Sequence, residues 1–185
     1  MAIIVATDLY GVTQALKDRF LVHVKEDIIW LSPWETELNP YADEATAHQV
    51  FVANDGFTTY SHKIKKTIHL ANSEQIRIIG FSVGATAAWL CLSEDNFKDK
   101  VEAWLFYGSR IRNYLDRSPN CLTYTVWSEY EIAFEPAVLL KDIEKLNIPA
   151  VIEPNSKHGF MNPVSKNFSE ILLTKYLHNI FEGNL

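Results

Sequence analysis

The sequence predicts an α/β fold in which helices cover both faces of a mostly parallel sheet. Short β-branched segments alternate along the chain with longer segments that have the apolar spacing of helices. The candidate strands are apolar at successive positions, a pattern typical of parallel strands that are buried on both faces. Such sheets bind ligands at the carboxyl ends of their strands, where the backbone must turn sharply. Most of the glycines fall at these turns: Gly11, Gly80, Gly84, Gly108 and Gly159.

The first 70 residues supply two candidate strands and two candidate helices. Ala2–Ala6 and Asp27–Leu31 contain short apolar runs and predict buried strands. Between them, Thr13–Val22 has apolar residues at helical spacing and predicts a helix. Ser32–Phe57 is irregular in pattern and contains proline and aromatic residues, so we expect no regular structure there. A second helix is expected over Thr58–Leu70.

The C-terminal part of the chain repeats this alternation of strand and helix. Segments rich in apolar, aromatic and β-branched residues predict three strands: Val101–Phe106, Leu122–Trp127 and Ile148–Ile152. Pro136–Leu146 predicts a helix with proline in its first turn, and Ser165–Phe181 predicts a final helix with an apolar stripe. The polar segment Arg110–Asn120 is expected to loop over the sheet edge. Because no linker or repeat interrupts the pattern, residues 1–185 are expected to form one domain.

The composition argues against several classes of function. With 17 basic and 23 acidic residues the net charge is −6, which argues against nucleic-acid and anionic-membrane partners. The N-terminus has no basic region before its short apolar run, and no apolar segment approaches the ~18 residues of a membrane span. The two cysteines, Cys91 and Cys121, indicate neither a disulfide framework nor a metal pair. We therefore expect a cytoplasmic protein, either a monomer or a homodimer.

The most informative segment is Gln75–Leu92, which reads QIRIIGFSVGATAAWLCL. Its first part, Ile76–Ile79, predicts a strand, and Ala85–Leu92 predicts a buried helix. The turn between them, Gly80–Gly84, matches the G-x-S-x-G pattern of a nucleophile elbow. Small residues two positions before and two positions after Ser82 let strand and helix approach closely, and the helix N-terminus favours developing negative charge. Ser82 is therefore the candidate nucleophile.

A serine hydroxyl is a weak nucleophile at neutral pH and needs a base, which an acid in turn orients. In folds with this elbow the order along the chain is serine, acid, histidine. Of the two histidines after Ser82, His178 falls inside the final helix, whereas His158 lies in the loop after the last strand. His158 is therefore the candidate base. No metal or cofactor is expected, since the earlier histidines lack metal-ligand spacing and are expected at the surface: His23, His48, His62 and His69.

The acid should follow the strand Leu122–Trp127, where the chain continues as Ser128–Phe134. Because this segment contains no aspartate, a glutamate must serve. Glu131 is the candidate acid and Glu129 the runner-up, and the sequence leaves this choice open.

Two backbone N–H groups should stabilise the oxyanion of an acyl-transfer intermediate. One belongs to Val83, directly after the candidate nucleophile and at the N-terminus of the predicted helix. The other should come from the turn after the first strand, and we assign it to Leu9.

With these segments in order, the chain resembles the dienelactone hydrolase-like family of the α/β-hydrolase superfamily over most of its length. The matching segments are Asp8–Thr13, Gly80–Gly84, Phe106–Ser109 and His158–Phe160. The resemblance implies a compact α/β-hydrolase fold without a cap domain and hydrolysis of esters or lactones through an acyl-enzyme. It also implies Ser82 as nucleophile, His158 as base, and backbone donors at Leu9 and Val83.

The chain departs from the family pattern in several ways. Ser82 stands where the family typically has cysteine, which favours a general serine esterase over a dienelactone specialist. Asp8 matches the glutamate that the family usually has beside the oxyanion turn, and the expected triad acid is a glutamate instead of an aspartate. The chain is also shorter than typical members.

Two functions follow as expectations. The first is a serine hydrolase that cleaves small carboxylic esters, lactones or thioesters through an acyl-enzyme intermediate. The alternative is a catalytically degenerate binding or regulatory module that keeps the fold. Within the matching segments, the candidate substrate-binding residues are Asp8, Tyr10, Phe81 and Tyr107.

Overall fold

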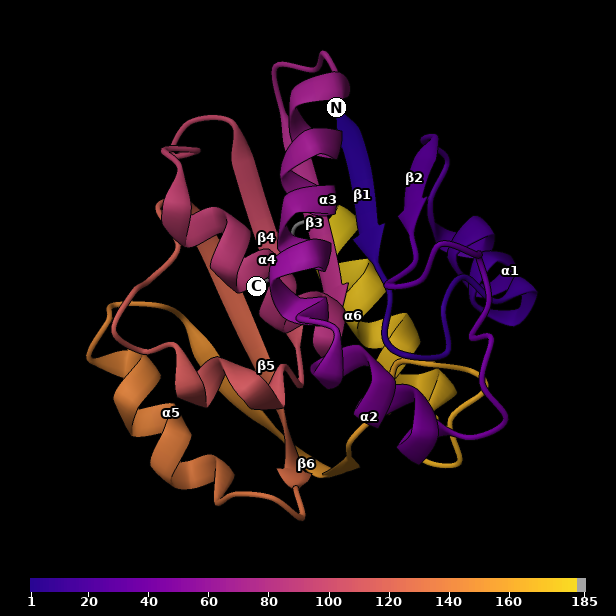
Figure 1. The fold of residues 1–185 in the computed structure, drawn as a ribbon. Coiled ribbons are helices and arrows are strands. Elements are labelled where there is room, and N and C mark those ends of the chain that lie inside the picture. Colours follow the sequence, from indigo (N-terminus) through magenta and orange to yellow (C-terminus); the bar gives the residue numbers. More distant parts are fainter. Residues whose placement is uncertain (183–185) are drawn as a thin grey trace.

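Within the described part of the chain, residues 1–182, six parallel strands form one sheet at the centre of the molecule (Figure 1). The structure is a computed structural model, and the last three residues of the predicted domain, 183–185, lie outside the described residues. The strands are β1 (Ala2–Ala6), β2 (Ile28–Leu31), β3 (Ile76–Phe81), β4 (Val101–Phe106), β5 (Leu122–Tyr130) and β6 (Ala150–Lys157). Their order across the sheet is β2-β1-β3-β4-β5-β6, and neighbouring strands are parallel. The predicted α/β fold is confirmed.

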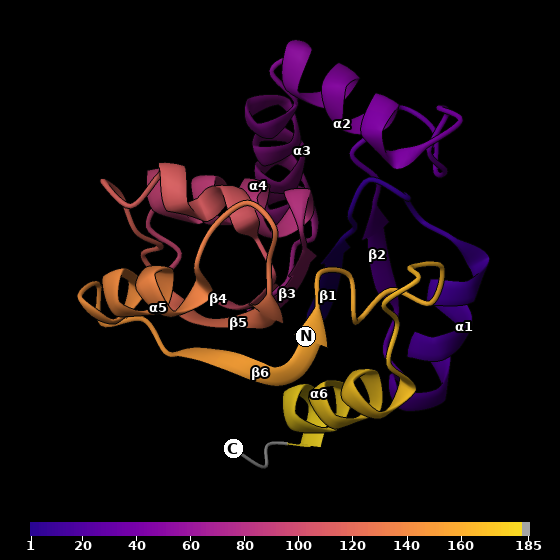
Figure 2. The ribbon, with the colours of Figure 1, turned by 90° about the horizontal axis from the view of Figure 1, so that it is seen from below.

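Helices cover both faces of the sheet, as Figure 2 shows. One face carries α2 (Glu44–Ala53), α3 (Gly56–Leu70), α4 (Val83–Glu94) and α5 (Pro136–Glu144). The other carries α1 (Gln14–His23) and α6 (Glu170–Glu182). Each layer packs its apolar side chains against the sheet in a core cluster of its own. This two-sided cover is the physical reason why β1 and β4, which have the predicted bounds, are apolar at every position but Glu102.

The prediction of irregular structure throughout Ser32–Phe57 is wrong, because the segment contains α2 and the first turn of α3. Asp43 caps α2 by accepting a hydrogen bond from the backbone N–H of Thr46 at 2.7 Å. The buried side of α2 consists of Ala47 and Phe51 alone, so its apolar periodicity is weak. A short 3-10 helix, η1 (Ser109–Asn113), likewise lies partly inside the predicted loop.

The two strands nearest the C-terminus extend beyond their predicted ends. β5 continues past Trp127 to Tyr130, and β6 continues past Ile152 to Lys157. The final helix begins at Glu170 and not at Ser165, because Ser169 accepts a hydrogen bond from the N–H of Leu172 and starts the helix there. As a result, the carboxyl ends of β5 and β6 lie lower in the view of Figure 1 than the end of β3 does.

Candidate active site

Ser82 lies on a strained turn between β3 and α4. Its φ of 51° and ψ of −110° are unusual for a residue with a side chain, and its backbone N–H donates to Phe106 O at 3.0 Å. The flanking glycines make this turn possible. A Cβ atom on Gly84 would lie 2.2 Å from Ala6 O, and one on Gly80 would lie 2.8 Å from Ala85 Cα. The turn thus has the close strand–helix approach that the sequence predicts.

Gly84→Ala is expected to destabilise the protein, because the added methyl group would overlap the backbone of β1 at Ala6. We expect a loss of about 3 kcal/mol in the free energy of unfolding, since the rigid strand cannot move aside. Urea denaturation followed by far-ultraviolet circular dichroism measures this loss. Ala88→Gly, in the same helix, provides a comparison, because it removes a methyl group instead of adding one. A Gly84→Ala variant as stable as the wild type would contradict the close approach.

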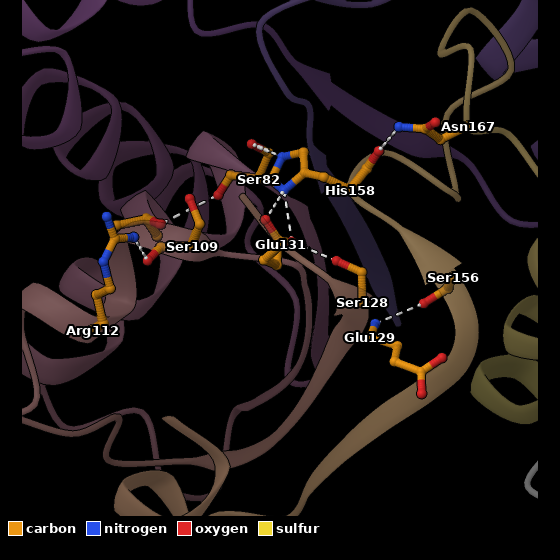
Figure 3. Close-up of polar contacts among 10 residues, drawn as sticks. Ser82, Ser109, Arg112, Ser128, Glu129, Glu131, Ser156, His158 and Asn167 are labelled. Atoms are coloured by element: carbon orange, nitrogen blue, oxygen red, sulfur yellow. Dashed lines mark hydrogen bonds and ion pairs between the residues drawn. The ribbon is translucent and has the colours of Figure 1, made fainter. Parts of the chain in front are cut away.

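Three side chains from separate segments form a continuous hydrogen-bonded chain (Figure 3). The hydroxyl of Ser82 lies 2.9 Å from Nε2 of His158. On the other side of the ring, Nδ1 lies 2.9 Å from Oε1 and 3.2 Å from Oε2 of Glu131. Ser128 donates its hydroxyl to the same carboxylate, and Asn167 Nδ2 donates to the carbonyl of His158 at 2.9 Å. The histidine is therefore held through both its ring and its backbone.

The structure separates the two candidate acids. The side chain of Glu131 is only 5% exposed and faces the histidine ring. Glu129 is exposed, and its carboxylate accepts the backbone N–H of Asn155 at 2.7 Å instead. Figure 3 shows the Glu129 carboxylate pointing away from His158. The runner-up position for Glu129 therefore has no support in the geometry.

The pKa of His158 reflects opposing effects. Burial by itself lowers the pKa, because it disfavours the charged imidazolium. The hydrogen bond and charge of Glu131 act in the opposite direction, and the nearby charges of Asp8 and Glu44 add to them. The net result is a pKa above the ordinary value of 6.5. The arrangement thus stabilises a protonated histidine, the state that follows removal of a proton from serine.

The two predicted oxyanion donors border the same cavity as Ser82. Leu9 and Val83 both line it, and Val83 is the first residue of α4, where no intrahelical acceptor exists for its N–H. The turn that carries Leu9 is held by a hydrogen bond of 3.1 Å from Gly11 N–H to Asp8 O. The indole N–H of Trp34 donates to Leu9 O at 2.9 Å. Both residues that are expected to supply oxyanion donors therefore border the cavity beside the nucleophile.

Two of the four candidate substrate-binding residues border a cavity and two do not. Asp8 and Tyr10 line a space of about 400 Å³ that also reaches Ser82 and His158. Tyr10 donates its hydroxyl to Glu44 at 3.0 Å. The assignment of Phe81 and Tyr107 needs correction, since they are 1% and 0% exposed and pack in the core on the α1–α6 side of the sheet. Tyr107 instead supports the ring of His158, with 5.0 Å between their centroids.

The main cavity beside Ser82 has a volume of about 560 Å³. Much of its wall comes from α2, the helix that the sequence analysis does not predict. His48, expected at the surface, is half-buried in this wall. Its pKa is lowered by burial and by the charge of Arg110, which lines the same cavity. No local pattern marks these residues, because only the packing of α2 brings them to the site.

Within residues 1–182, no group of three or more histidine, cysteine, aspartate or glutamate side chains is arranged to hold a metal ion. In the same residues, no helix is both long enough and apolar enough to cross a membrane.

Comparison with known proteins places this geometry in context. No protein-family model matches the chain. The uncharacterised protein YczH of Bacillus subtilis is 34% identical over 188 residues, which cover 98% of this chain and 91% of YczH.

Solved structures resemble the chain in fold. A Klebsiella pneumoniae protein assigned as a dienelactone hydrolase has a TM-score of 0.70 at 14% identity, over 99% of this chain and 87% of its own. The dienelactone hydrolase-like promiscuous phosphotriesterase P91, from metagenomic libraries, has a TM-score of 0.69 at 11% identity, over 98% and 85%. The carboxylesterase CesB of Bacillus subtilis has a TM-score of 0.63 at 10% identity, over 100% and 84%. These likenesses confirm the predicted α/β-hydrolase fold of dienelactone hydrolase type.

Proposed function

The chain belongs to the same protein family as YczH of Bacillus subtilis and has the dienelactone hydrolase-like fold, and from this premise we propose that it is a serine hydrolase. Its substrates are small carboxylic esters, lactones or thioesters, and the reaction passes through an acyl-enzyme. The observation that carries this proposal is the hydrogen-bonded chain from Ser82 through His158 to Glu131. His158 stands within hydrogen-bond distance of both the nucleophile and the acid.

In the acylation step, Ser82 Oγ attacks the carbonyl carbon of the substrate while His158 Nε2 takes the hydroxyl proton. Glu131 keeps the ring in the required tautomer and stabilises the imidazolium. The N–H groups of Leu9 and Val83 donate to the oxyanion of the tetrahedral intermediate. When the intermediate collapses, the bond to the alcohol or thiol breaks and the leaving group takes the proton from His158.

Deacylation repeats these roles with water as the nucleophile. His158 takes a proton from the water as it attacks the acyl carbon, and the bond to Ser82 breaks. The proton returns from His158 to the serine oxygen, which releases a carboxylic acid and restores the enzyme. From a lactone, the product is a single hydroxy acid.

The cavity supports small polar substrates over long acyl chains. Its volume of about 560 Å³ lies within the range of small-molecule binding sites. Glu44, His48, Gln49 and Arg110 give the wall beside Ser82 a polar and charged character. A long hydrocarbon chain would displace water from these groups without replacing its hydrogen bonds, at a cost in binding free energy.

The alternative, a non-catalytic binding module, is less well supported. A strained backbone at Ser82 and a buried carboxylate at Glu131 both cost folding free energy. Ligand binding alone does not require that Ser82, His158 and Glu131 form one hydrogen-bonded chain. Their alignment favours catalysis over a binding role.

Covalent labelling tests the proposal directly. A fluorophosphonate probe is expected to form a single adduct on Ser82, because the aligned base makes this hydroxyl more reactive than other serines. Intact mass and peptide mapping locate the adduct. His158→Ala should abolish labelling, whereas His178→Ala, in α6, should not. Absence of an adduct under conditions that label a control serine esterase would favour the binding module instead.

A further inference from the structure

Asp8 is a buried carboxylate that the proposed mechanism does not use. It is 5% exposed and forms no ion pair with any described residue, although burial of a lone charge is costly. Burial raises its pKa to about 6, against the opposing effect of its hydrogen bonds. A group retained at such a cost, beside the nucleophile and the base, calls for an explanation in terms of its contacts.

The first contact of Asp8 is with its own turn. Oδ1 accepts the backbone N–H of Tyr10 at 3.0 Å, while the carbonyl of the same peptide, Leu9 O, accepts the indole N–H of Trp34 at 2.9 Å. The preceding peptide is held as well, because Asp8 O accepts Gly11 N–H. In a trans peptide the N–H points opposite to the carbonyl, so fixing Asp8 O also fixes the direction of Leu9 N–H.

The second contact of Asp8 reaches the other end of the chain. Oδ2 accepts a hydrogen bond of 2.7 Å from Nδ2 of Asn162, which is 1% exposed. The amide oxygen of Asn162 accepts Val164 N–H at 3.1 Å, and its backbone N–H donates to Gly159 O at 3.0 Å. Asn162 thus belongs to the turn that directly follows His158. With both halves of its amide occupied, the orientation of that amide is determined.

We propose that Asp8 and Asn162 are positioning residues whose hydrogen bond fixes the oxyanion donor of Leu9 relative to the base His158. This inference rests on the proposed function, since it assigns the hydrogen bond a role in the same reaction. The oxyanion donor and the base lie on separate turns, after β1 and after β6, and the Asp8–Asn162 bond joins these turns directly. Catalysis of acyl transfer depends on both groups holding their positions as the carbonyl becomes tetrahedral.

An exchange of the two side chains provides the test. In Asp8→Asn alone, whichever way the new amide turns, its NH2 faces either Asn162 Nδ2 or Tyr10 N–H, so a repulsive contact replaces one of the two hydrogen bonds. In the double variant Asp8→Asn/Asn162→Asp, the new asparagine donates to the new aspartate, and every other bond keeps its polarity. Asn162→Ala removes the link without repulsion and keeps the charge of Asp8 near His158.

The expected result is a change in kcat with little change in KM, since the oxyanion contact forms only in the transition state. With p-nitrophenyl acetate, we expect kcat to fall about 10- to 100-fold in Asp8→Asn and Asn162→Ala, less than the ~10²–10³-fold cost of losing a donor outright. The double variant should recover to within about fivefold of the wild type. Glu153→Gln is the control: it alters another buried carboxylate, which binds Lys175 and Tyr176 in α6 and does not reach the site.

Amide hydrogen exchange supplies a readout that does not depend on activity. Peptides that cover Asp8–Gly11 and Gly159–Ser165 should exchange faster in both single variants and return to wild-type rates in the double variant. Unchanged exchange in both peptides, or a double variant with no recovery of either exchange or kcat, would overturn the inference. If the wild type has no esterase activity but the variants show this exchange pattern, the proposed function is contradicted and the link between the two turns still stands.

Discussion

Ser82→Ala is expected to lower kcat for ester hydrolysis by at least about 10⁴-fold, because no other group takes over as nucleophile. The variant should fold normally, since alanine can replace serine without new contacts at the N-terminus of α4. Hydrolysis of p-nitrophenyl acetate, with thermal unfolding measured in parallel, tests both statements. Small thioesters and lactones, such as δ-valerolactone, extend the measurement to the other proposed substrates.

Ser93→Ala is the matched control for this change. Ser93 lies near the other end of α4, where its hydroxyl donates to Trp89 O at 2.7 Å. Its loss should alter stability slightly and leave kcat unchanged. Equal turnover by wild type and Ser82→Ala would exclude the proposed nucleophile.

Glu131→Gln is expected to lower kcat about 10²- to 10⁴-fold, whereas Glu129→Gln should keep it within about twofold. An amide at position 131 can present its NH2 to Nδ1 of His158 and favour the wrong tautomer. An amide at position 129 can still accept the N–H of Asn155 through its oxygen, so this second variant is a matched control. The two glutamates stand two positions apart at the end of one strand, yet only Glu131 contacts the histidine.

The pH profiles of the wild type and of Glu131→Gln give an independent readout of the role of Glu131. The base must be neutral to take a proton, so kcat/KM should rise as pH rises through the pKa of His158. In the wild type this pKa lies above 6.5, so the midpoint of the rise in kcat/KM also lies above pH 6.5. Without the charge of Glu131, the effect of burial dominates, and the midpoint should move to lower pH in Glu131→Gln. A large loss of activity in Glu129→Gln together with an unchanged Glu131→Gln would reverse the assignment.

The sequence was sufficient where local patterns carry the information. The bounds of β1 and β4 follow from short runs that are apolar except at Glu102, because both strands are covered on two faces. The turn at Ser82 follows from its two glycines, since their Cβ atoms would collide with the neighbouring backbone. α2 was missed because a helix that buries only Ala47 and Phe51 leaves little periodicity.

The choice between Glu129 and Glu131 shows the limit of a periodic pattern. In a regular strand the two side chains would share one face, because side chains alternate with a period of two. The pairing of β5 with β6 is irregular between Ser128 and Tyr130, and β5 ends at Tyr130, so the regular alternation does not extend to Glu131. The two carboxylates therefore diverge, one toward His158 and the other toward Asn155.

The sequence by itself determined the parallel sheet, the sharp turn at Ser82 and the loop position of His158, because each depends on residues close together in the chain. Only the tertiary structure decided which glutamate meets the histidine, which helix forms the cavity wall and how the turn of Leu9 is held. The hydrogen bond between Asp8 and Asn162 joins residues 154 positions apart. No sequence pattern marks Asn162 or links it to Asp8, since the contact exists only where the folded sheet brings the carboxyl ends of β1 and β6 to one side of the molecule.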